Sequence, residues 1–359
     1  MTLVAEAANE VGTRQDPHVQ ARSARQQPLL LHSMALFREV LAVVFEHRPI
    51  RTVVEVGVET GQVSACYAEL GAEAVHCVEP APTEQLRRTL AEHDALHLVE
   101  GRSPDVLPEI PIADLYVLDG DHNYAAVRAE LDWILVNAPD AVVVLHDVLW
   151  PCSRRDLYYL PRSPGDQHHE SSDDGPTIWH DDLTPSGFVG AGQFTFATTA
   201  GGERNGVLTA TEDAIAEHGG RLEIVPAVFG LGVLLREGSE ADQLIGEALS
   251  PYTGSALLSA MENNRLALYT RVLAMQAEAV AHADEADRQV RELQDRNAEV
   301  AELRSRCDEL IRRHAEELDA LRNRNEELGR QLDRERVPKP VREVVRIARR
   351  AKRSLSRRA

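Results

Sequence analysis

Two carboxylates and an imidazole directly follow an apolar run in residues 117–124, Val-Leu-Asp-Gly-Asp-His-Asn-Tyr. Asp119, Asp121 and His122 therefore stand where a buried strand would end. Imidazole, with an unperturbed pKa of ~6.5, can take a proton from a substrate near neutral pH. The carboxylates can attract a cation or accept hydrogen bonds. These residue types together predict proton-transfer chemistry on a small molecule at a strand end.

A second such edge occurs in residues 53–61, Val-Val-Glu-Val-Gly-Val-Glu-Thr-Gly. Gly57 would let the backbone approach a ligand closely. A dinucleotide-binding turn needs glycine two residues later to admit a pyrophosphate, and this chain has Glu59 there. An acidic turn suits the sulfonium and ammonium of S-adenosylmethionine (SAM). We therefore predict that Glu55, Gly57 and Gly61 bind this cofactor, although the glycine spacing alone also fits an ordinary turn.

Two further polar residues extend the predicted cofactor site. Glu79 ends the next apolar run, 22 residues after Gly57. An acid at about this distance can accept hydrogen bonds from both hydroxyls of a ribose. Ser103, in a small polar turn, could border an adenine. The alternatives are a surface glutamate at a strand end and a simple loop.

Apolar runs alternate with helical segments through most of the first 236 residues. This alternation predicts a parallel sheet covered by helices on both faces. The last two strands lie close together and predict an antiparallel pair, unlike a dinucleotide-binding domain. The expected strands are 52–56, 74–78, 96–99, 115–118, 141–145, 222–228 and 232–236.

The motifs in combination resemble class I SAM-dependent methyltransferases. The resemblance rests on Glu-x-Gly-x-x-x-Gly from Glu55, then Glu79, then Asp-Gly-Asp-His-x-Tyr from Asp119, then His146-Asp147. The last two motifs are similar to a branch that includes sugar and macrolide O-methyltransferases. The resemblance covers roughly 29–236 and implies an α/β fold, a Rossmann-like seven-stranded sheet. Residues 138–141, Ala-Pro-Asp-Ala, depart from the Gly-Gly turn usual in the family.

The resemblance also implies roles for the residues after the fourth and fifth strands. Asp119 would contact the cofactor, and Asp119 and Asp147 would hold a divalent cation, with His146 replacing a second acid. Two oxygen ligands suit Mg²⁺, whereas an imidazole leaves room for another divalent cation or for none. Without a metal, His146 and Asp147 would orient the substrate. The catalytic base is His122 or Asp121, and Asp121 could instead cap the following helix.

These observations predict a SAM-dependent O-methyltransferase that acts on a hydroxyl of a sugar, a glycan or a glycosylated metabolite. An N-methyltransferase is one rival. Another is a scaffold, in which a methyltransferase-like domain is carried by a coiled coil into a glycan-assembly complex. Because the motif residues are all present, a degenerate domain is disfavoured.

The remaining sequence divides by composition. We expect a disordered leader over 1–27, a methyltransferase domain over 28–240 with a lid or substrate loop over 150–206, and a linker over 241–258. Heptad spacing predicts a coiled coil over 259–336, and Asn325 on its seam favours a parallel dimer. Pairing with a different protein, or a single charged helix against the body, are the alternatives. A basic tail covers 337–359.

Charge is distributed unevenly. The net charge is −19. Residues 337–359 contain nine Lys/Arg and one Glu, or +8, so the other residues carry −19 − 8 = −27. Such an acidic body argues against nucleic-acid binding. The tail predicts docking on an anionic membrane surface, or else a solubilising end or one that pairs with the body.

The sequence gives little sign of export. Four cysteines are widely spaced and predict reduced thiols, as in a cytoplasmic protein. No apolar run approaches the ~20 residues of a membrane span. We therefore expect a cytoplasmic location, with the basic tail able to hold the protein at the inner face of the membrane.

Overall fold

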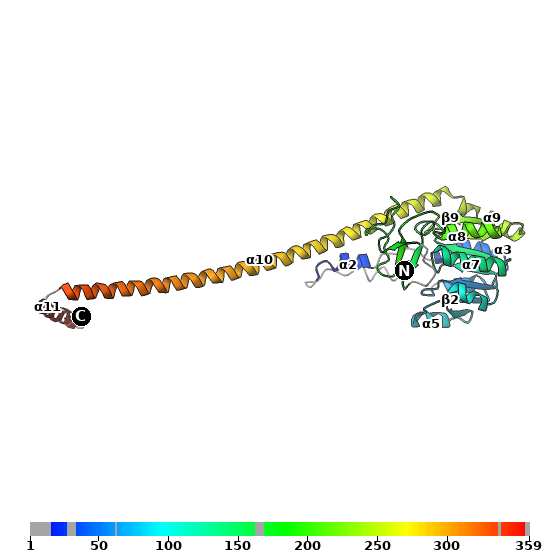
Figure 1. Ribbon diagram of the computed structural model, residues 1–359. Helices are drawn as coiled ribbons and strands as arrows, with labels where there is room; N and C mark the ends of the chain where they lie inside the picture. The colour runs from blue at the N-terminus through cyan, green and yellow to red at the C-terminus, as the bar shows by residue number, and fades with distance from the viewer. Residues whose placement is uncertain (1–15, 27–33, 62, 162–168, 337–338, 356–359) are drawn as a thin grey trace. The chain divides into compact units, whose positions relative to one another are not determined.

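A seven-stranded sheet forms the centre of the protein. The computed structural model describes residues 16–26, 34–61, 63–161, 169–336 and 339–355 (Figure 1). The strand order is β3-β2-β1-β4-β5-β10-β9, with β10 antiparallel to both β5 and β9 and the other pairs parallel. The expected sheet is therefore confirmed, including its reversed end. Its strands are β1 Thr52–Val56, β2 Ala74–Glu79, β3 Leu96–Glu100, β4 Leu115–Leu118, β5 Val142–His146, β9 Arg221–Val225 and β10 Leu231–Leu235.

Helices bury both faces of this sheet, as the continuous apolar strands require. Alternate residues of one strand enter different cores: Val53 packs with α3, α4, α5 and α9, whereas Val54 packs on the other side with α7. Helix α8 packs against α7. The bounds are α3 Arg38–His47, α4 Ser64–Leu70, α5 Glu84–Ala91, α6 Ser103–Val106, α7 Tyr124–Asn137, α8 Val207–His218 and α9 Glu240–Thr253, with 3₁₀ turns η1 Met34–Phe37 and η2 Leu107–Glu109.

The insertion after β5, where we expected a lid or substrate loop, is folded within its described residues. Within its described residues, β6 Leu157–Tyr159, β7 Ser171–Ser172 and β8 Phe194–Ala197 form a small antiparallel sheet in the order β6-β8-β7. Phe188 and Phe196 are buried in the main core. The high content of Gly, Pro and Asp in this insertion predicts a loop. A few aromatic residues nevertheless pack it against the core, and composition alone does not reveal them.

Two other boundaries differ from expectation. Residues 241–258 are not a linker: helix α9 occupies most of them, begins at its cap Ser239, and buries Ile245 and Leu249. The expected leader includes helix α2, Val19–Gln26, where Asp16 accepts a hydrogen bond from the backbone N–H of His18. Residues 1–15 and 27 of that leader lie outside the described part.

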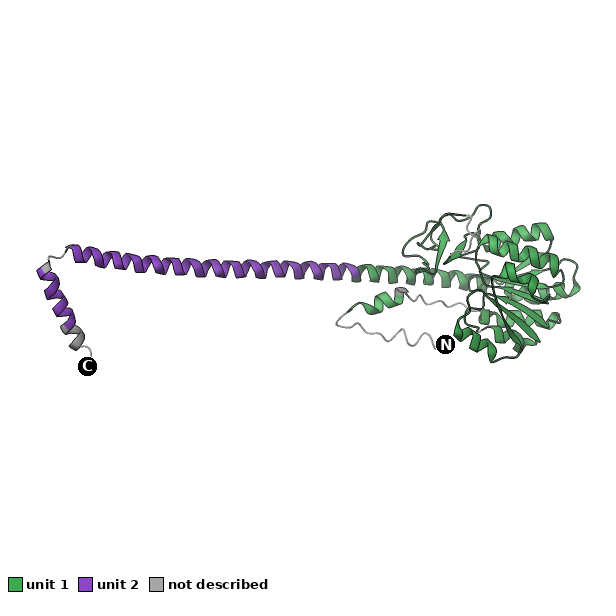
Figure 2. Cartoon of the chain, turned by 60° about the horizontal axis from the view of Figure 1, so that its bottom comes forward, with its two compact units in different colours: residues 1–283 green, residues 284–359 purple. Residues whose placement is uncertain are grey.

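A long helix, α10, covers Ala256–Arg336. The chain separates into compact units at 1–283 and 284–359 (Figure 2), so the start of α10 belongs with the sheet. There Leu266, Leu273 and Ala283 are buried. The coiled-coil segment that we predicted from residue 259 therefore begins with a part that packs on the first unit. Helical periodicity alone does not distinguish these two kinds of packing.

The second unit contains the rest of α10 and helix α11, Lys339–Leu355. The apolar residues on the predicted seam here are exposed, and pairing through them stays a prediction. They are Leu293, Val300, Leu303, Leu310, Ile311, Leu318, Leu321, Leu328 and Leu332. Among the described helices, none is both long enough and apolar enough to cross a membrane.

Candidate functional site

The turn after β1 brings the ends of three strands together. The N–H of Gly57 donates to the carbonyl of Val78 on β2, and Asp119 after β4 donates to Val56. Gly57 has φ +86°, and a Cβ there would lie 2.2 Å from the carbonyl oxygen of Asp119. Only glycine fits this position. The close approach of the chain after β4 therefore already requires glycine here, whether or not a ligand binds.

Glu79 lies beside this turn, as predicted. Its carboxylate accepts hydrogen bonds from the backbone N–H of Ala81 at 3.1 Å and of Glu59 at 3.4 Å. Each oxygen retains a further lone pair for a ligand hydroxyl. The structure thus brings together Gly57, Gly61 and Glu79 around one edge. Their contact with SAM stays a prediction.

Glu55 and Ser103 are engaged within the protein. Glu55 is 4% exposed and accepts a hydrogen bond from the Ser64 hydroxyl, and burial raises its pKa to about 8. The Ser103 hydroxyl donates to Glu130 on α7, whose pKa burial likewise raises to about 8. Both carboxyls are therefore largely protonated at neutral pH. A role for Glu55 or Ser103 at the cofactor must compete with these bonds and stays a prediction.

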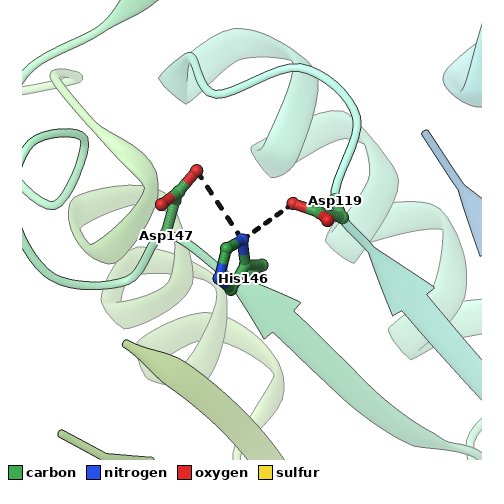
Figure 3. A group of neighbouring side chains, drawn as sticks. All are labelled: Asp119, His146 and Asp147. Carbon is green, nitrogen blue, oxygen red and sulfur yellow. Dashed lines mark hydrogen bonds and ion pairs between the residues drawn. The ribbon is translucent and has the colours of Figure 1, made fainter. Parts of the chain in front are cut away.

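Four charged or titratable side chains meet at the ends of β4 and β5. Nδ1 of His146 lies 3.0 Å from Oδ1 of Asp119 and 3.8 Å from Oδ2 of Asp147 (Figure 3). Nε2 of His122 lies 3.0 Å from Oδ2 of Asp147 and 3.5 Å from Oδ1 of Asp119. We call these four residues the His-Asp cluster. Two of its members follow β4, and two end or follow β5.

Mutual attraction controls the charges in the His-Asp cluster. Burial alone would lower the pKa of both histidines, but the aspartates raise it to about 10 for His122 and about 9 for His146. Burial would raise the pKa of Asp119 and Asp147, but the histidines hold both below the ordinary value. The cluster is thus a compact set of alternating charges, in which the histidines are buried and the aspartates remain partly exposed.

The donor atoms of this cluster fit a divalent cation. Ligand atoms of Asp119, His146 and Asp147 lie within 4.8 Å of one another. Nε2 of His146 donates to the carbonyl of Val228 at 3.0 Å, so its Nδ1 faces Asp119 either with a second proton or with a shared cation. Oδ1 of Asp147 is buried without a hydrogen-bond partner. Two carboxylates and one imidazole suit Mg²⁺ or Mn²⁺.

Asp121 forms an ion pair outside the His-Asp cluster. Its carboxylate pairs with Arg102 at 3.4 Å. The cap of α7 is Asn123, whose side chain accepts from the N–H of Ala126 at 3.0 Å, so the alternative role that we gave Asp121 is wrong. Of the two candidate bases, only His122 lies among the cluster side chains.

Sequence reasoning missed two residues that support the cluster and placed a third, Tyr159, only within the expected lid. The hydroxyl of Tyr159, on β6 of the insertion, lies 3.5 Å from Nδ1 of His122. Val228, before β10, supplies the carbonyl that orients His146. Glu262, on α10, accepts from the N–H groups of Val228 and Phe229 at 2.9 Å each. No local motif signals these residues, because each is distant in the chain from the cluster.

Glu262 connects helix α10 to the loop at Val228 and Phe229 by hydrogen bonds. Its oxygens also accept from Arg265 at 2.7 Å each, and the Arg265 guanidinium lies 4.3 Å from the centre of the Phe229 ring. Burial would raise the pKa of Glu262, but the hydrogen bonds from Arg265 and the loop lower it overall. Val228 and Phe229 both have positive φ, a backbone region that costs energy for such side chains. Glu262 thus stabilises a strained loop that orients His146.

Comparisons with known proteins agree with this architecture. Residues 54–148, from β1 to just after Asp147, match the model of a methyltransferase domain family. No curated protein sequence matches the chain significantly. The SAM-bound structure of an amino pentose methyltransferase from Micromonospora echinaspora is 15% identical, covers 60% of this chain and 95% of its own, and has a TM-score of 0.36.

An O-methyltransferase from Streptomyces achromogenes, solved with SAM, is 19% identical. That match covers 36% of this chain and 64% of the other, with a TM-score of 0.28. These structural likenesses are too remote to carry an argument about the reaction. The family match and the strand order carry the assignment of the domain.

Proposed function

We propose that the chain, which is a class I SAM-dependent methyltransferase, moves a methyl group to a hydroxyl of a sugar, a glycan or a glycosylated metabolite. The observation that carries this proposal is the His-Asp cluster beside the Gly57 turn. The carbonyl of Asp119 touches that turn, while its side chain belongs to the cluster. SAM bound at the turn and a hydroxyl that accepts the methyl group at the cluster would therefore be neighbours.

Methyl transfer to a hydroxyl needs one bond formed, one broken and one proton removed. The acceptor oxygen bonds to the methyl carbon as the carbon–sulfur bond of SAM breaks, and S-adenosylhomocysteine leaves. Positioning the two reactants in line supplies much of the rate. His122 is the better candidate to accept the hydroxyl proton, because Asp121 is paired with Arg102. His122 can do so only as a neutral imidazole, and a cation held by Asp119 and Asp147 would favour that form by offsetting the carboxylates that raise its pKa.

Asp119, Asp147 and His146 would hold a divalent cation at this site. Such a cation would lower the pKa of a bound hydroxyl and neutralise charge among the carboxylates. Val228 would fix the ring orientation of His146, as partners of metal-bound histidines commonly do. The protein side chains would thus orient the acceptor oxygen toward His122.

The insertion supplies the surface on which an acceptor could rest. Tyr159 is 43% exposed beside His122, and Trp179 is 62% exposed. Aromatic faces can cover the apolar face of a sugar ring, and Asp173, Asp174 and Asp181 could accept hydrogen bonds from its hydroxyls. This composition supports a sugar acceptor. An amine acceptor, and hence an N-methyltransferase, is the second candidate.

The direct test is calorimetric titration of SAM into the full chain, with and without Mg²⁺, followed by transfer of labelled methyl to a panel of sugars, glycosides and amines. We expect SAM binding that Glu79→Ala weakens and labelling of a hydroxyl acceptor. Labelling of amines alone would indicate that the chain is an N-methyltransferase and not an O-methyltransferase. A folded chain that binds no SAM would favour the scaffold, which would tolerate Asp119→Ala and Asp147→Ala in cells.

We also propose that residues 284–336 pair with a second copy as a parallel coiled coil. Leucines on the predicted seam are about half exposed or more, for example Leu293 at 59% and Leu321 at 59%. Pairing would bury them, and Asn325 on the seam would fix the register. Light scattering of the full chain should give twice the monomer mass. A monomer would rule out this self-pairing and leave a different protein partner or a single unpaired helix.

A further inference from the structure

Helix α11 separates two kinds of side chain onto two faces. Val341, Val344, Val345 and Ala348 recur at spacings of three and four, so they share one face, with Ile347 at its edge. The exposed fractions are 50% for Val341, 66% for Val344, 43% for Val345 and 63% for Ile347. An aliphatic surface of this length is therefore presented to solvent.

The opposite face is basic. Arg342, Arg346, Arg349 and Arg350 follow the same helical spacing, and Glu343 is the only acid in residues 337–359. All four arginines carry charge at any physiological pH. Long arginine side chains can also extend from the edge of an apolar face to a polar layer above it.

Together, the aliphatic face and the basic face of α11 indicate which kind of partner it binds. The acidic body could attract the arginines, but charge attraction does not require an aliphatic face. Nucleic acid would leave the valines in water. An anionic bilayer satisfies both faces, because its acyl boundary accepts aliphatic side chains and its headgroups pair with arginine.

We propose that α11 lies in the plane of an anionic phospholipid bilayer, with its valines and Ile347 toward the acyl chains and its arginines among the headgroups. A helix that lies in the plane of the bilayer attaches the protein to its surface without crossing it. It would hold the enzyme at the surface where lipid-linked acceptors are found. The proposal does not rest on the reaction, since binding can be measured without any acceptor.

The test is co-sedimentation of the full chain with vesicles of phosphatidylglycerol and phosphatidylcholine, compared with phosphatidylcholine alone, at low and physiological salt. Three paired variants isolate the faces. Val344→Gln with Ile347→Gln removes apolar contact without changing the charge or lowering the helix propensity. Arg346→Gln with Arg349→Gln removes two charges. Arg304→Gln with Arg312→Gln makes the same charge change on the exposed part of α10.

We expect the unmodified chain to bind the anionic vesicles alone, more weakly as salt rises. The apolar-face variant should lose binding. The basic-face variant should bind about thirty-fold more weakly, since each arginine contributes about 1 kcal/mol, and the α10 control should bind as the unmodified chain does. The proposal is overturned if the chain binds no vesicles, binds both kinds equally, or is unaffected by the apolar-face change.

Discussion

The two halves of the candidate site, one at the ends of β1 and β2 and the other at the ends of β4 and β5, are built differently. At the ends of β1 and β2, a glycine turn and one glutamate are held mainly by nearby backbone. At the ends of β4 and β5, two buried histidines and two partly exposed aspartates depend on one another and on two remote elements, the insertion and α10. The first half can be recognised from a motif. The second requires distant parts of the chain to arrive correctly.

The largest expected effect is in the second half. Asp147→Ala removes the carboxylate nearest His122 and a predicted metal ligand. We expect methyl transfer to fall on the order of a thousandfold and Mn²⁺ binding to be lost, because the cation loses a ligand and His122 loses the carboxylate that orients its ring. Single-turnover rates and Mn²⁺ titration measure these losses. SAM affinity, the internal control, should barely change; if it fell as much as the rate, the two halves would be one unit.

The next effect is in the cofactor half. Glu79→Ala removes an acceptor for charge-assisted hydrogen bonds, which contribute ~1.5–3 kcal/mol each, so SAM affinity should fall roughly 10- to 100-fold. Calorimetry measures this loss, and Mn²⁺ binding should be unaffected. Glu84→Ala, an exposed glutamate at the start of α5, is the matched control. Equal affinity in both variants would remove Glu79 from the cofactor site.

A smaller effect is expected from the remote support. Glu262→Gln replaces an oxygen that accepts N–H bonds with an amide that donates, and it breaks the pair with Arg265. The strained loop at Val228 should relax and release His146. We expect about a tenfold lower transfer rate and weaker Mn²⁺ binding, with SAM affinity retained.

Nitrogen NMR of the histidine rings distinguishes this positioning role from general destabilisation. The His146 resonances should shift in Glu262→Gln, while those of an exposed histidine stay unchanged. Glu278→Gln makes the same chemical change at an exposed site on the same helix and should leave the spectrum intact. Unshifted His146 resonances in Glu262→Gln would mean that α10 only stabilises the fold.

The smallest effect should come from Tyr159→Phe. Its hydroxyl is 3.5 Å from His122, at the limit of a hydrogen bond, while the ring also packs edge-on against Phe194. Phenylalanine keeps that packing, so we expect about a threefold change in rate. Rates with the identified acceptor measure it. A loss above a hundredfold would make the tyrosine hydroxyl a direct participant in the reaction.

Several features followed from the sequence alone. The seven strands, the reversed last pair and the placing of Asp119 and Asp147 at neighbouring strand ends all reflect short-range patterns of apolar residues. Gly57 was also identified locally, since a turn that needs positive φ favours glycine. The predicted contacts of Glu55, Ser103 and the other site residues with ligands stay predictions.

Tertiary structure decided which side chains meet and what charge they carry. The sequence did not indicate that Ser103 bonds Glu130, that Asn123 rather than Asp121 caps α7, or that Glu262 supports a loop beside His146. Periodicity and turn chemistry depend on neighbours in the chain. Burial, pKa and hydrogen-bond partners depend on contacts between distant segments, and these exist only once the sheet, the insertion and the start of α10 have packed together.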